Sequence, residues 1–185
     1  YMKILNFGSL NIDYVYSVDH FVQKGETISS SQMNIFSGGK GLNQSVALGR
    51  AGAKVFHGGR IGKGGEFLVE QLKESGVNTD LVVLDEGCST GHAIIQNDVE
   101  GDNCILLYGG ANQRITKEQI DDTLSHFEAG DYVVLQNEIN NLPYLMEKAA
   151  KKQMNIVLNP SPMDEKIKAL PLDKVTLFFV NEIEA

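Results

Sequence analysis

The sequence predicts an α/β fold in which a parallel sheet carries helices on both faces and a small β lid lies beside the sheet. The second half of the chain alternates strand-like and helix-like segments with short connections. Its strands are nearly continuous apolar runs, such as residues 132–136 and 175–180, and such runs are typical of parallel strands buried on both faces. Polar, alternating segments near the start do not suit that sheet and predict the separate lid.

Each element follows from a local pattern. An apolar run ending at Gly8 predicts the first core strand, and the segment after it alternates as an exposed strand does. Leu42, Val46 and Gly49 share one face of a helix that ends at Gly52. The predicted strands are 3–8, 11–18, 26–36, 54–58, 81–84, 90–96, 103–108, 132–136, 156–159 and 175–180. The predicted helices are 41–50, 66–75, 116–127, which opens with a capping box, and 142–153.

Composition excludes several classes of function. The net charge of −8 disfavours nucleic acid and anionic membranes as partners. Cys88 and Cys104 form no CxxC motif and are expected to be reduced, and the four histidines have no zinc-site spacing. No apolar run reaches the length of a membrane span and no signal peptide precedes the first strand, so a cytoplasmic protein is expected.

The glycine-rich segment 37–53, SGGKGLNQSVALGRAGA, does not match the common phosphate-binding loops. A Walker A loop requires Gly-x-x-x-x-Gly-Lys-Ser/Thr, and neither Gly39-Lys40 nor Gly62-Lys63 has the glycine and the hydroxyl residue at the required places. The dinucleotide motif GxGxxG is also absent after Gly8.

The same segment predicts a helix N-terminus that could bind an oxygen-rich ligand. Gly38, Gly39 and Gly41 would let a ligand approach the backbone, and free amides at the helix start would donate to it. Lys40 and Asn43 add a cation and an amide. This set favours a polyhydroxylated molecule over a phosphate. The alternative is a flexible turn with an incidental lysine.

Several acidic and amide side chains are candidates for the same site. The Asp13 carboxylate can accept two hydrogen bonds from neighbouring hydroxyls, and it lies where the core meets the lid. Glu138 follows a buried strand at its carboxyl end, where α/β sheets bind ligands. Asn181 and Glu184 follow the last strand in the same way. Taken singly, each of these residues could equally be a solvated loop residue.

Taken together, the motifs resemble the PfkB (ribokinase-like) family of carbohydrate kinases over essentially the whole chain. The matching segments are 11–13, 38–44, 110–112, Glu138, 159–162 and 181–184. The resemblance implies a Rossmann-like, ribokinase-like fold that is incomplete in this chain. It places the α/β core at 1–10, 41–87 and 111–185, and the lid at 11–40 and 88–110.

The resemblance also implies roles for individual residues. It implies transfer of the γ-phosphoryl group of ATP to the 5-hydroxyl of D-ribose, with Mg²⁺ and a monovalent cation (K⁺), by a homodimer that associates through the lid. Asn181 would contact the nucleotide, and Glu184 would organise Mg²⁺ through water. The residues implied to hold the sugar are Asn11, Asp13, Gly38, Gly39, Lys40, Gly41, Asn43 and Glu138.

The chain departs from the family in one respect. The Gly-Ala-Gly-Asp motif with the family's catalytic base, the adenine-binding strands and the cation loop are not found, and we expect them beyond Ala185. The apolar strand 175–180 would lie bare, because no helix follows to cover it, and the chain would be a truncated, inactive piece of a kinase. The alternative for this strand is an edge strand that a second copy of the chain covers. The alternatives are another kinase of this family, for fructose, 2-keto-3-deoxygluconate or nucleosides, or a non-catalytic sugar-binding module.

Overall fold

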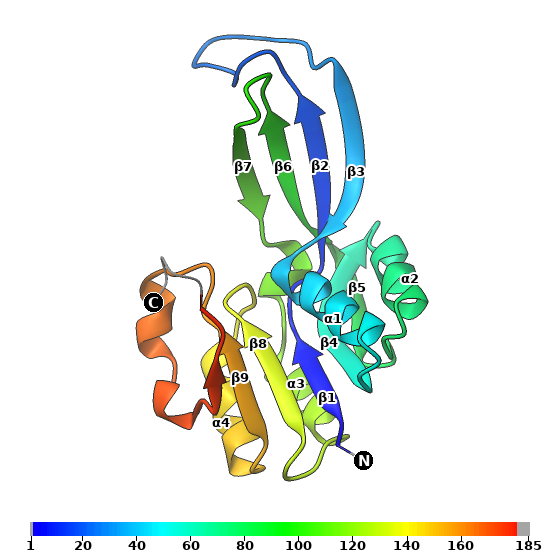
Figure 1. The fold of residues 1–185 in the computed structure, drawn as a ribbon, viewed down its shortest axis with the longest axis vertical. Coiled ribbons are helices and arrows are strands. Elements are labelled where there is room, and N and C mark those ends of the chain that lie inside the picture. The colour runs from blue at the N-terminus through cyan, green and yellow to red at the C-terminus, as the bar shows by residue number, and fades with distance from the viewer. Residues whose placement is uncertain (1, 181–185) are drawn as a thin grey trace.

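The computed structural model describes residues 2–180, and its larger sheet has six parallel strands in the order β10-β9-β8-β1-β4-β5 (Figure 1). The short strand β1 lies inside this sheet, between β8 and β4. The strands are β1 (Ile4–Phe7), β4 (Val55–Lys63), β5 (Val82–Ser89), β8 (Tyr132–Gln136), β9 (Asn155–Asn159) and β10 (Leu177–Phe178). The parallel sheet predicted from the sequence is confirmed.

Helices cover both faces of this sheet, as predicted (Figure 1). Leu5 and Phe7 of β1 point into a core that they share with α3 (Lys117–Leu124) and α4 (Leu142–Lys151). Ile4, one residue away, packs on the opposite side in the core of α1 (Lys40–Arg50) and α2 (Glu66–Glu74). Side chains alternate between the two faces of a strand, so these short apolar strands build two cores at once. No helix in the described part of the chain is long and apolar enough to cross a bilayer.

Helix ends follow the local chemistry of the sequence. The Thr116 hydroxyl accepts a hydrogen bond from the Gln119 amide at 3.0 Å, which confirms the predicted cap of α3. After α1 and α2 the chain turns at Gly52 and Gly76, whose φ angles of 86° and 83° suit glycine. Within residues 2–180, three short 3₁₀ turns complete the helical elements, η1 (Gly110–Gln113), η2 (Glu165–Ala169) and η3 (Leu172–Lys174).

A second, four-stranded sheet extends away from the first (Figure 1). In it β2 pairs antiparallel with β3 and parallel with β6, and β6 pairs antiparallel with β7 as the predicted hairpin. Its strands, in the order β3-β2-β6-β7, are β2 (Asn11–Ser17), β3 (Gln32–Gly38), β6 (Gly91–Asn97) and β7 (Asn103–Tyr108). Residues 26–31, predicted as strand, lie outside this sheet, in the connection between β2 and β3, where the hydroxyls of Ser30 and Ser31 donate to the Ser17 carbonyl.

The strands β4 and β5 are longer than the sequence predicts. The glycines near residues 58–65 resemble a loop, but they lie within β4 or at its end, where backbones approach closely. A Cβ at Gly62 would collide with the carbonyl oxygen of Cys88 in β5. At the other edge of the sheet, β10 has only two residues. Among the described residues it pairs with β9 alone, and Phe178 and Phe179 are 45% and 62% exposed.

A buried chain of hydrogen bonds joins β1, β4 and α1. The Asn6 amide group donates to the Gly41 carbonyl and to the Ser45 hydroxyl, both at 2.7 Å. The Ser45 hydroxyl lies 2.7 Å from Nδ1 of His57, whose Nε2 lies 3.1 Å from the Gly8 carbonyl. Because a carbonyl can only accept, Nε2 carries the proton and Nδ1 accepts from Ser45. Burial lowers the pKa of His57 to about 4.

We predict that acid weakens the fold through His57. The unfolded chain binds a proton at His57 near pH 6.5, whereas the folded chain resists protonation down to about pH 4. The unfolding free energy should therefore fall by roughly 3 kcal/mol as the pH drops from 6.5 to 4. Urea denaturation across this range measures the loss, and NMR of the imidazole assigns it. A His57 ring that titrates near pH 6.5 in the folded chain would contradict this account.

Candidate functional site

The site is built where the carboxyl end of β1 meets the N-terminus of α1. A Cβ at Gly8 would lie 2.7 Å from the Cα of Gly41, and a Cβ at Gly41 would collide with the backbone nitrogen of Ser9. Both glycines are therefore needed for the strand end and the helix start to touch. Gly39, just before the helix, has a φ of 95°, a conformation that L side chains rarely adopt.

The first amides of α1 already have partners within the chain. The Lys40 amide donates to Oε1 of Glu138 at 2.7 Å, and the Gly41 amide donates to the Ser9 hydroxyl at 3.1 Å. The Leu42 amide donates to the Ser9 carbonyl at 2.9 Å. The expectation that these amides are free for a ligand is therefore wrong, because acceptors from two other segments occupy them. Gly41 matters to the site because its lack of a side chain lets α1 approach Ser9 closely, and its N–H group is already bonded to the Ser9 hydroxyl.

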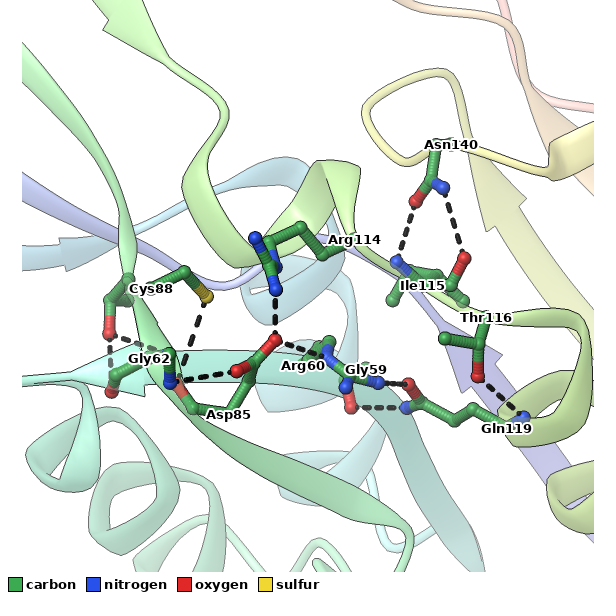
Figure 2. Close-up of polar contacts among 12 residues, drawn as sticks. Gly59, Arg60, Gly62, Asp85, Cys88, Arg114, Ile115, Thr116, Gln119 and Asn140 are labelled. Carbon is green, nitrogen blue, oxygen red and sulfur yellow. Dashed lines mark hydrogen bonds and ion pairs between the residues drawn. The ribbon is translucent and has the colours of Figure 1, made fainter.

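Glu138 is held from several sides. Its Oε1 accepts from the Lys40 amide and from the Ser9 hydroxyl, the latter at 2.6 Å. Its backbone carbonyl accepts from the Gln113 side chain at 3.1 Å. Two residues further on, Asn140 bonds to both backbone groups of Ile115, at 2.8 and 3.0 Å (Figure 2). The loop after β8 is thus fixed to the segment around η1.

That segment is in turn fixed to the edge of the larger sheet (Figure 2). Oδ2 of Asp85 accepts from Nε of Arg60 at 3.2 Å and from Nε of Arg114 at 3.0 Å. The Gly87 amide and the two guanidinium groups lower the pKa of Asp85 to about 2, so the carboxylate stays charged at neutral pH. Gln119 adds a bond from its side chain to the Gly59 carbonyl at 2.8 Å. These contacts keep the loop that carries Glu138 in place.

Asp13 approaches the helix start from the second sheet. It is paired with Phe36 of β3, and its carboxylate lies so close to Gly38 that any side chain there would strike it. Partial burial raises the pKa of Asp13, and the negative charge of Glu138 raises it further. The two carboxylates, 125 residues apart in the sequence, are therefore near enough to repel each other.

The remaining candidates for the sugar site lie on β2, on α1 or at the junction of β3 and α1. Asn11 is buried, and its Oδ1 accepts from Nδ2 of Asn112 at 2.7 Å. Lys40 is half-buried at the first position of α1, and Asn43 is exposed on the first turn. Gly38 and Gly39 connect β3 to α1. The two candidates for nucleotide and magnesium contacts, Asn181 and Glu184, lie outside the described residues.

Three polar residues of the site had no assigned role in the sequence analysis. Ser9 binds both Glu138 and α1, and Asn112 binds the Leu10 amide at 2.9 Å as well as Asn11. Gln136 is 1% exposed, and Oε1 of its side chain has no partner among residues 2–180. A polar residue at the end of an apolar strand is the one sequence signal that Ser9 and Gln136 share.

The chain matches the family model described as pfkB family carbohydrate kinase over residues 2–185. The chain belongs to this family. The match covers nearly the whole sequence, and it agrees with the resemblance carried by the glycine motif and its neighbours.

Several of the named relatives are ribokinases. A ribokinase of Staphylococcus aureus is 33% identical over 192 residues, which cover 99% of this chain and 62% of the relative. The crystal structure of a Cryptococcus neoformans ribokinase in complex with ADP matches with 34% identity and a TM-score of 0.86, covering 100% of this chain and 58% of that one. An Arabidopsis thaliana ribokinase complexed with ribose and ATP matches with 26% identity and a TM-score of 0.83, covering 99% and 61%.

These comparisons confirm the ribokinase-like fold inferred from the sequence. They also show that the chain spans about three fifths of the length of the relatives that it matches. The described residues therefore correspond to the N-terminal part of the pfkB fold.

We predict that replacing Asp13 by Asn stabilises the fold at neutral pH. A raised carboxyl pKa means that the folded chain holds this proton more tightly than the unfolded chain, so the ionised form opposes folding. The melting temperature of Asp13→Asn should exceed that of the wild type by a few degrees at pH 7.5, and the difference should shrink as the pH falls. Asp122→Asn, an exposed control on α3, should have little effect. A lower melting temperature for Asp13→Asn at pH 7.5 would contradict the repulsion.

Proposed function

We propose that this chain forms the sugar-binding part of an ATP-dependent ribokinase, which phosphorylates D-ribose at its 5-hydroxyl to give ribose 5-phosphate. The proposal is carried by the convergence of Asp13, Lys40 and Glu138 at one end of the parallel sheet. The Lys40 amide donates to Glu138 directly, and partial burial together with the charge of Glu138 raises the pKa of Asp13. Ribokinases among the relatives support the choice of sugar.

The charges at the site favour a neutral polyol. Two carboxylates close together repel phosphate and carboxylate ligands, but each can accept hydrogen bonds from neighbouring hydroxyl groups. Oε2 of Glu138 has no partner within residues 2–180, so it remains available as an acceptor. The Lys40 ammonium group and the Asn43 amide can donate to other hydroxyls of the same sugar.

The second sheet is proposed to act as the lid over the sugar, formed by residues 11–40 and 88–110. Asp13 and Asn11 belong to this sheet, whereas Glu138 belongs to the core. A sugar held between them would be enclosed when the sheet closes, and the loss of water would strengthen the hydrogen bonds. The missing side chains of Gly38 and Gly39 leave room at the junction for the Asp13 carboxylate and the Ser9 hydroxyl to approach the backbone.

ATP is proposed as the phosphoryl donor, because structures of related ribokinases contain ADP or ATP. Asn181 would contact its phosphates and Glu184 would organise Mg²⁺ through water, while K⁺ would bind elsewhere in the whole kinase. Within residues 2–180 the one carboxylate cluster that could hold a metal is Asp98, Glu100 and Asp102, at the β6–β7 turn.

The sequence has no Gly-Ala-Gly-Asp motif to supply the catalytic base. The chain alone is therefore proposed to bind ribose without phosphorylating it. The cytoplasm is its proposed location.

We predict that D-ribose binds at Asp13 and the start of α1. In an NMR titration, amide shifts should concentrate at residues 38–43 and 138, and 2-deoxy-D-ribose should bind more weakly because it lacks one of two neighbouring hydroxyls. Asp13→Ala should raise the Kd at least tenfold, since a hydrogen bond to a charged group is worth about 1.5–3 kcal/mol. Adding ATP and Mg²⁺ should yield no ribose 5-phosphate.

Three results would count against this assignment. A wild-type chain that shows no shifts with ribose has no ribose site, and a Kd unaffected by Asp13→Ala places the site elsewhere. Ribose 5-phosphate formed by the purified chain would show that it carries a catalytic base of its own.

Association through the second sheet is proposed as well. Phe36, Ile105 and Leu107 lie on the same face of this sheet as Asp13, because the register pairs Asp13 with Phe36 and Ala93, and Ala93 with Leu107. All three are more than half exposed, at 54%, 59% and 53%. An exposed apolar face of this kind is typical of protein–protein contacts, and the same face on a second copy is its proposed partner.

We predict that Leu107→Asp converts the dimer to a monomer, because it places a charge in the apolar contact. The matched control is Leu106→Asp, since Leu106 is the adjacent residue, is 71% exposed and points to the other face. Sedimentation velocity at several concentrations measures the outcome. A wild-type monomer at high concentration, or equal effects of the two substitutions, would exclude this interface.

A further inference from the structure

The carboxylate of Glu138 is divided between two tasks. Its Oε1 accepts from the Lys40 amide at 2.7 Å and from the Ser9 hydroxyl at 2.6 Å. Its Oε2 has no hydrogen-bond partner among residues 2–180. One oxygen is thus fixed at the helix start, and the other is left to a ligand.

The Ser9 hydroxyl is what sets this division. The hydroxyl donates its one proton to Glu138 and accepts a hydrogen bond from the Gly41 amide at 3.1 Å. Its only donor and one of its acceptor positions are therefore in use. Its own position is fixed in turn, because Ser9 is fully buried and its carbonyl binds the Leu42 amide at 2.9 Å. The hydroxyl therefore cannot turn away from Glu138 without leaving buried polar groups unpaired.

We propose that Ser9 is a positioning residue for the sugar, acting through Glu138, an inference that rests on the proposed function. Without the Ser9 proton, only the Lys40 amide would hold Oε1. The carboxylate could then rotate about its last side-chain bond, a torsion with broad preferences. Its free oxygen would no longer face the hydroxyls that it has to accept from.

The chain offers a matched control at Ser45. Ser45 is also a fully buried serine and lies within α1, but its hydroxyl bonds to Asn6 and His57 rather than to Glu138. Ser9→Ala and Ser45→Ala therefore remove the same group from equally buried positions, one in contact with the start of α1 and one within α1. Both should lower the melting temperature, whereas only Ser9→Ala should disturb Glu138.

Two measurements test the inference, one of which needs no ligand. Hydrogen exchange of the Lys40 amide should become about tenfold faster in Ser9→Ala than in Ser45→Ala, because its acceptor is less firmly held. In NMR titrations with D-ribose, Ser9→Ala should raise the Kd about tenfold and Ser45→Ala should leave it within twofold of the wild type. In a Glu138→Ala background, Ser9→Ala should add less than twofold, since the two residues act as one unit.

Each other outcome overturns the inference. Equal Lys40 exchange in the two serine variants would mean that Ser9 does not orient Glu138. Equal Kd values for D-ribose would mean that the orientation of Glu138 does not affect sugar binding. A tenfold effect of Ser9→Ala in the Glu138→Ala background would mean that Ser9 affects sugar binding independently of Glu138. A wild-type chain that binds no ribose but shows the exchange difference would instead reject the proposed function, together with the sugar role of Ser9.

Discussion

The contact that the site depends on is the cap at the start of α1, where Ser9 and Glu138 accept its first amides. A helix start carries unpaired N–H groups and a partial positive charge, so a carboxylate is stabilised there. Its acceptors come from the end of β1 and from the loop after β8, two neighbouring strands of the parallel sheet. The three hydrogen bonds of this cap therefore fix α1, β1 and the loop after β8 relative to one another. They also determine the position from which Glu138 can contact a ligand.

Asp13 adds a second carboxylate, whose ionised form is disfavoured by its surroundings. Partial burial and the nearby charge of Glu138 both raise its pKa, whereas Asp85 at the sheet edge is neutralised by two arginines. The chain thus contains two kinds of acidic residue. Asp85 holds the structure together, whereas the Asp13 carboxylate is partly desolvated and has no hydrogen-bond partner among residues 2–180. Binding sites commonly retain such unfavourable groups because the ligand supplies the missing partners.

Much of the fold and part of the site could be predicted from the sequence. Apolar runs and helix caps have local signatures, so the parallel sheet, the hairpin and the cap at Thr116 were predictable. The lengths of β4 and β5 were not, because the glycines that allow close strand packing also resemble a loop. The sequence did not show that the amides of Lys40 and Gly41 have partners, because their acceptors are distant along the chain. A single serine such as Ser9 also forms no motif that would indicate its role. The predicted roles of Asn181 and Glu184 concern residues outside the described range.

The alternation of side chains along β2 limits which insertions and deletions this strand can tolerate. Asp13 and Tyr14 are neighbours in the chain but point to opposite faces of the second sheet, and both flanking strands fix that alternation. Inserting or deleting one residue before Asp13 in β2 would turn the carboxylate outward and present a different side chain to Glu138. Side chains in this segment can therefore be exchanged more readily than its length can change, whereas the loop after Ser17 can grow or shrink without moving Asp13.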